Sequence, residues 1–110
     1  MAEPRLTSGF WVRAYIARLR VFDIPAFITA HGDEDAGAII IKLNTLDGQA
    51  KAFERAYGPM GDRIWAVFSE GPDGDVEAAL ARQKGRDPDL WIVEVEDRAG
   101  RHLLDEEGLG

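Results

Sequence analysis

Three residues near the end of the chain are the best placed to do chemistry together: Glu94, Glu96 and His102. The two glutamates are two positions apart, so on a β-strand both side chains would project from the same side, with Cα atoms about 7 Å apart. Two carboxylates and an imidazole can hold Mg²⁺, Mn²⁺ or Zn²⁺ with positions left open for water. Since a metal-bound water is a nucleophile, one hypothesis is a small metal-dependent hydrolase.

Residues 90–105 also fit a β-hairpin in which these side chains bind no metal. Residues 90–93 are apolar on both faces, and Val95 then alternates with the two glutamates. The turn at residues 98–100 ends in glycine, which suits a three-residue loop with a left-handed third position. This register pairs Asp97 with Arg101, Glu96 with His102 and Val95 with Leu103. The charged residues would then be cross-strand pairs on the solvated face of an edge hairpin.

Other catalytic and binding patterns are missing. The chain has no cysteine, so it has no disulfide, thiolate zinc site or thiol nucleophile. The acidic turns that start at Asp33 and Asp73 do not match a calcium loop: the first has Gly37 and Ala38 at its fifth and sixth positions, and the second has Ala78 in place of the required glycine at its sixth. No Gly-Lys-Ser/Thr phosphate loop occurs. His31 could act as a base with Asp33 or Asp35, or be an ordinary satisfied polar residue. We expect no cofactor.

Charge limits the choice of partners. The net charge is −7, although residues 1–31 carry four arginines against Glu3 and Asp23, a net +2. An acidic chain without a basic stripe repels phosphate groups, so we expect neither nucleic acid nor a membrane as a partner. No apolar run reaches the roughly 18 residues of a membrane span, and the first residues are polar. We therefore expect a cytoplasmic protein.

Hydrophobic periodicity predicts a helix, four strands, a second helix and a final hairpin. Thr7 or Ser8 can cap the first helix, whose apolar positions recur at helical spacing until Pro25 ends it. The expected strands cover residues 26–31, 38–44, 49–57 and 63–70. The second helix follows the turn at residues 71–75 and stops at Gly85, and the hairpin covers residues 90–105.

This order of elements is typical of an α+β domain. We expect a two-layer domain, with a mostly antiparallel sheet of about five to six strands and two helices packed on one face. A chain of 110 residues forms one domain over residues 1–110. Residues 1–6 and 106–110 are expected to be frayed.

Three segments resemble a known family: SGFWVRA at residues 8–14, DAGAIIIK at residues 35–42 and DPDLWIVEVEDR at residues 87–98. They are similar to a family of small bacterial proteins catalogued as a domain of unknown function. The resemblance covers essentially the whole chain and is most specific in the last segment. It implies a bacterial cytoplasmic protein that makes up the whole family unit, and it brings no catalytic or binding residues with it.

A second hypothesis for the function is a protein-interaction module without catalytic activity, whose partner could be a second copy of itself. The acidic surface, the aromatic residues in several strands and at least one strand edge that must be covered favour it over the hydrolase. The candidate contact residues are Trp65, Trp91, Arg13 and Arg20. The alternatives are a place in the core for the tryptophans and a solvated helix face for the arginines.

Overall fold

The computed structural model describes residues 6–106, which form a five-stranded sheet and two helices. The elements are α1 (Ser8–Val21), β1 (Ala26–Ala30), β2 (Ile39–Asn44), β3 (Gln49–Tyr57), β4 (Arg63–Pro72), α2 (Asp73–Arg86) and β5 (Trp91–Glu96). The strand order is β1-β5-β2-β3-β4. β2 and β5 are parallel, and the other neighbouring strands are antiparallel. The expected α+β class and mostly antiparallel sheet are confirmed.

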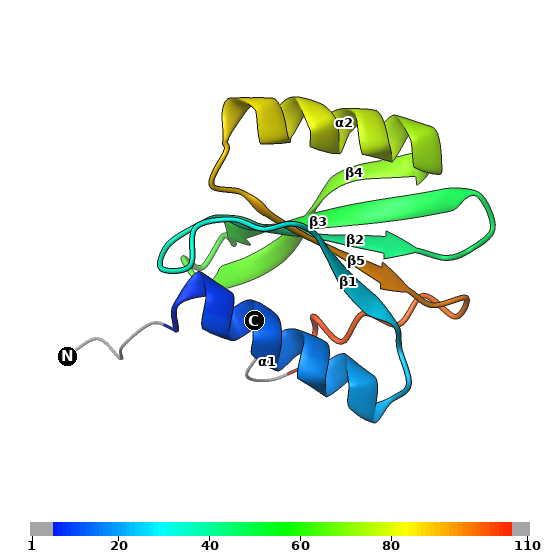
Figure 1. The fold of residues 1–110 in the computed structure, drawn as a ribbon, viewed down its shortest axis with the longest axis horizontal. Coiled ribbons are helices and arrows are strands. Elements are labelled where there is room, and N and C mark those ends of the chain that lie inside the picture. Colours follow the sequence, from blue (N-terminus) through cyan, green and yellow to red (C-terminus); the bar gives the residue numbers. More distant parts are fainter. Residues whose placement is uncertain (1–5, 107–110) are drawn as a thin grey trace.

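The two helices lie on opposite faces of the sheet, with the sheet between them (Figure 1). The apolar side of α1 packs against Ile41 and Val93, whereas Val76 and Leu80 of α2 pack against Ile40 and other even-numbered strand residues. Since side chains alternate along a strand, β2 and β5 are covered on both sides. The expectation of both helices on one face is therefore corrected. The isoleucine run in β2 is the pattern of such a doubly covered strand.

β5 is a central strand, and this overturns the predicted final hairpin. Val95 pairs with Ala26 of β1 on one side and with Leu43 of β2 on the other. Both edges of β5 are thus occupied, and residues 101–103 follow as irregular chain without strand pairing. The predicted turn itself is present, because Gly100 has a φ of +78° and its N–H donates to the carbonyl of Asp97.

The ends of the first helix follow the expected chemistry. The Thr7 side chain accepts a hydrogen bond from the N–H of Phe10, which satisfies one free donor of the first turn. Near the end of the described chain, Arg18 donates to Glu106 at 3.0 Å, so Glu106 is held against α1. Apart from Leu6, the other residues that were predicted to be frayed, 1–5 and 107–110, lie outside the described residues. Neither described helix is long and apolar enough to cross a membrane.

Candidate functional site

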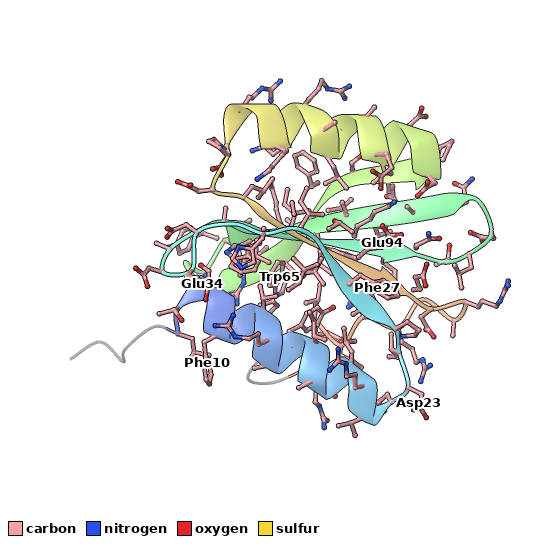
Figure 2. All side chains as sticks on the ribbon, in the orientation of Figure 1. Phe10, Asp23, Phe27, Glu34, Trp65 and Glu94 are labelled. Atoms are coloured by element: carbon pink, nitrogen blue, oxygen red, sulfur yellow. The ribbon has the colours of Figure 1, made fainter. Side chains whose placement is uncertain are left out.

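Glu94 belongs to a charged cluster on the α2 face of the sheet, opposite Phe27 of β1 (Figure 2). The ammonium group of Lys42, a residue only 2% exposed, contacts the carboxylates of Asp73 at 2.7 Å, Glu77, and Glu94 at 3.5 Å. Burial alone would lower the pKa of Lys42, but its hydrogen bonds to Asp73 and Glu77 and the charge of Glu94 outweigh burial and raise the pKa. Lys42 is therefore a charged group that ties the start of α2 to the sheet.

His102 lies on the other face of the sheet. Its ring centroid is 4.8 Å from that of Phe53, which packs in the core beneath α1. The Nδ1 atom accepts a hydrogen bond from the N–H of Leu104 at 3.0 Å, and the backbone carbonyl accepts one from the hydroxyl of Tyr15 at 2.7 Å. Burial lowers the pKa of His102, as Lys51 does to a smaller extent, against the opposing effect of Asp105. The imidazole is thus a neutral acceptor that belongs to the packing of α1.

The metal hypothesis needs these groups in one place, and the fold separates them. Glu94 and Glu96 are on the α2 face by alternation along β5, whereas His102 is on the α1 face. The carboxylate of Glu94 also accepts a hydrogen bond from Asn44 at 3.1 Å, in addition to its contact with Lys42. Within residues 6–106, no group of three or more acidic or histidine side chains is arranged to hold a metal ion.

Arg13 lies in a second polar cluster, at the start of α1. Its guanidinium contacts Glu34 at 2.9 Å, and His31 Nε2 lies 3.3 Å from the same carboxylate. The hydrogen bond from Arg13 lowers the pKa of Glu34. Figure 2 shows Glu34 above the first turn of α1, where the N–H of Gly9 donates to the Glu34 carbonyl. His31 therefore pairs with Glu34, and not with Asp33 or Asp35, which were its partners in the hypothesis of a catalytic base.

The remaining candidate contact residues occupy three different settings. Trp91 is fully buried, and its Nε1–H donates to the carbonyl of Asp33 at 2.7 Å, so it is a core residue. Arg20 is exposed on α1. Trp65 is partly buried on β4, with its ring 5.3 Å from Trp11 and the guanidinium of Arg55 4.5 Å from its ring centroid. Of the two tryptophans, Trp65 is the one that reaches the surface.

Trp65 also belongs to a feature that the sequence did not reveal, the outer side of β4. We call the side of residues 63–70 that faces away from β3 the β4 edge. In the part of the chain that the structure describes, β4 pairs with β3 alone. Five consecutive apolar residues, 64–68, follow this edge. Ile64 is 36% exposed and Val67 is 50% exposed. The apolar run was visible in the sequence, but only the strand order places it at an edge.

The sequence profile of a family described as "Protein of unknown function (DUF1491)" matches residues 6–105. The chain belongs to this family. The segments at residues 35–42 and 87–98, which suggested a family, meet where β2 pairs with β5, since the N–H of Trp91 donates to the carbonyl of Ala38 at 2.8 Å. The third joins them at the start of α1, where Ser8 Oγ donates to the carbonyl of Gly37 at 2.6 Å. The DUF1491 segments therefore build one continuous part of the fold.

Solved structures of bacterial proteins share this fold. A crystal structure of a DUF1491 family protein from Caulobacter crescentus CB15 is 36% identical, with a TM-score of 0.83, and the match covers 93% of this chain and 97% of that chain. An NMR structure of a DUF1491 family protein from the same organism is 35% identical, with a TM-score of 0.80 and coverage of 94% and 96%. Protein Atu0922 from A. tumefaciens is 27% identical, with a TM-score of 0.71 and coverage of 84% and 86%. Comparison with curated proteins finds no match.

Proposed function

We propose that this DUF1491 protein is a protein-interaction module that binds its partner along the β4 edge. The observation that carries the proposal is the run of five apolar residues at an edge that has no second strand in the described structure. An edge strand presents a row of backbone N–H and C=O groups, and an extended segment of another chain can pair with them. Ile64 and Val67, which are partly exposed on either face of the edge, would be covered by such a segment.

Two of the three groups first considered for catalysis, Glu94 and His102, already have partners within the fold. Glu94 is bound to Lys42 and Asn44, and His102 is bound to the backbone of Leu104. Each of these side chains is therefore accounted for by packing within the fold. The β4 edge differs from them, because Ile64 and Val67 are exposed apolar side chains.

β1 is the other edge of the sheet and offers a weaker template. It has five residues against ten in β4, and its register with β5 shifts between Ile28 and Ala30. Short edges and register irregularities are two ways in which proteins blunt strand edges. β4 has one irregularity, at Phe68, but residues 63–67 pair with β3 without interruption. β4 therefore presents the longer regular edge.

The proposal is tested by comparing three versions of the tagged protein in affinity capture from native lysate: wild type, Val67→Lys and Phe27→Lys. Phe27 is the matched control, because it is on the β1 edge and is 51% exposed, against 50% for Val67. We expect Val67→Lys to lose a partner that wild type and Phe27→Lys both retain. We also expect the amides of residues 63–70 to become protected from hydrogen exchange in the recovered complex. Capture of the same proteins by all three versions would overturn the proposal.

A further inference from the structure

We infer that the partner of the β4 edge is a second copy of this chain, paired antiparallel about a two-fold axis at Ala66. The sheets of the two copies would then join into one continuous sheet. This inference rests on the proposed function and names its partner. The observation that carries it is that two antiparallel copies of β4 match each other, both in the face to which each side chain projects and in the sign of the charges at the two ends.

The alternation of side chains fixes which pairings are possible. Trp65 and Val67 lie opposite Arg55 and Phe53 of β3, so both are on the α1 face, whereas Ala66 is on the α2 face. With Ala66 opposite Ala66 of the second copy, each Trp65 meets a Val67, and both side chains of the pair project to the α1 face. An aromatic residue opposite a β-branched residue is a stabilising cross-strand pair. The small side chain of Ala66 allows close approach at the axis.

The irregularity in β4 is compatible with this register. Phe68 is the extra residue, since Val67 pairs with Phe53 of β3 and Ser69 pairs with the next residue, Ala52. Phe68 packs toward α2, and Ser69 lies opposite the buried Ala52 of that same face. If Phe68 and Ser69 together face Ile64 of the second copy, the alternation of faces is kept on both sides of the bulge.

This register brings Arg63 opposite Glu70 of the second copy. Arg63 directly precedes the apolar run, Glu70 follows it after Ser69, and both charged residues are exposed. By alternation, Arg63 lies on the α1 face; Glu70 lies opposite Lys51, with its carboxylate 3.4 Å from the Lys51 ammonium, on that same face. A two-fold axis repeats each contact, so two Arg63–Glu70 pairs would close the two ends of the interface. A partner unrelated to this chain would not require opposite charges at these two positions.

The test is the mass of the purified protein in sedimentation equilibrium over a range of concentrations. An edge interface of this kind is small, so we expect a dimer with a Kd on the order of micromolar. Arg63→Glu places like charges opposite each other twice and should weaken the dimer on the order of ten-fold. The double variant Arg63→Glu/Glu70→Arg restores opposite charges across the interface and should recover part of that loss; the recovery is incomplete because Glu70→Arg also removes the contact of Glu70 with Lys51. Val67→Lys should give a monomer, and Phe27→Lys should keep the wild-type constant.

Circular dichroism and thermal unfolding of each variant show whether the fold is kept. A wild-type protein that is monomeric at all concentrations would overturn the inference, as would a dimer that neither Arg63→Glu nor Val67→Lys weakens. The proposed function fails by a different result, namely capture from lysate that does not depend on Val67. A monomeric protein whose lysate partner is lost in Val67→Lys would therefore refute the self-association and support an interaction module with a different partner.

Discussion

Gly37 lies so close to the backbone of Asp89 that a β-carbon at position 37 would overlap the Asp89 carbonyl oxygen. The same carbonyl accepts a hydrogen bond from the N–H of Asp33 at 3.0 Å, and the N–H of Gly37 donates to the carbonyl of Asp33 at 3.2 Å. The loop between β1 and β2 is thereby held against the turn that precedes β5. This contact sets the register in which Trp91 enters the sheet beside Ile39.

Gly37→Ala should therefore destabilise the protein, because a β-carbon would also lie 2.9 Å from Cδ1 of the buried Trp91. Overpacking of this kind costs about 1–3 kcal/mol of unfolding free energy. Urea denaturation measures the loss. Gly85→Ala is the matched control, since Gly85 is in α2 with no atom near its absent β-carbon. That change should stabilise the protein by about 0.5–1 kcal/mol, and equal stability of the two variants would contradict the prediction.

Lys42→Met should also destabilise the protein. The substitution keeps most of the buried volume but leaves the Glu94 carboxylate, the least exposed of the three that contact Lys42, with only Asn44 as a partner. Removing one member of a buried charged group is unfavourable, and we expect a loss of about 1–3 kcal/mol at neutral pH. The double variant Lys42→Met/Glu94→Gln should recover part of it. An unchanged denaturation midpoint for Lys42→Met would show that the cluster does not stabilise α2 on the sheet.

Stability should fall on the acidic side of neutrality because of His102. Burial lowers the pKa of His102 below its ordinary value of 6.5, so the unfolded chain binds the proton more readily than the folded chain. The neutral His102 therefore contributes to the free energy of unfolding at pH values above its pKa in the unfolded chain. This contribution is lost as the pH falls below about 6.5. Protonation would also cost Nδ1 its hydrogen bond from Leu104. In thermal unfolding between about pH 7.5 and 5.5, wild type should lose more stability than His102→Gln; parallel curves would contradict this.

Divalent cations should not stabilise the fold through Glu94, Glu96 and His102. The three groups are on two faces of the sheet, and Glu94 already contacts Lys42. A metal ion at 100 times its Kd would add about 2.7 kcal/mol, which a thermal shift assay of chelator-treated protein resolves readily. We expect no such shift with Mg²⁺, Mn²⁺ or Zn²⁺. A shift that Glu96→Gln removes would restore the metal hypothesis.

The local elements could be predicted from the sequence because their signals are local. Residues 49–57 were expected as a strand and form β3, and the expected loop at residues 98–100 has its third residue, Gly100, at a φ of +78°. The placement of these elements depends on contacts between distant residues. Residues 90–93 are apolar on both faces, which is typical of a buried strand, but no local pattern indicated that β5 would lie between β1 and β2.

At the candidate site, too, local features could be predicted from the sequence, whereas contacts between distant residues could not. Glu94 and Glu96 do project from one side of a strand, as their spacing requires. Their surroundings depend on α2, which brings Asp73 and Glu77 to Lys42. Lys42 stands within the apolar run of β2, and this position indicates a buried charge. Lys42 was not among the candidate residues predicted from the sequence. His102 was expected across from Glu96, and it was misplaced because that expectation required an edge that β5 does not have.

The central position of β5 has a consequence for the order in which the chain folds. Within residues 6–106, β1 is joined to the rest of the sheet only through β5, and Phe27 pairs with Glu94, far along the chain. Before β5 is in place, β2, β3 and β4 can form their consecutive hairpins, but β1 has no strand to join. The sheet is therefore completed by contacts of long sequence separation, which form slowly and leave apolar strands exposed for a time. In refolding from denaturant, the amides of β1 should therefore become protected from hydrogen exchange no earlier than those of β5.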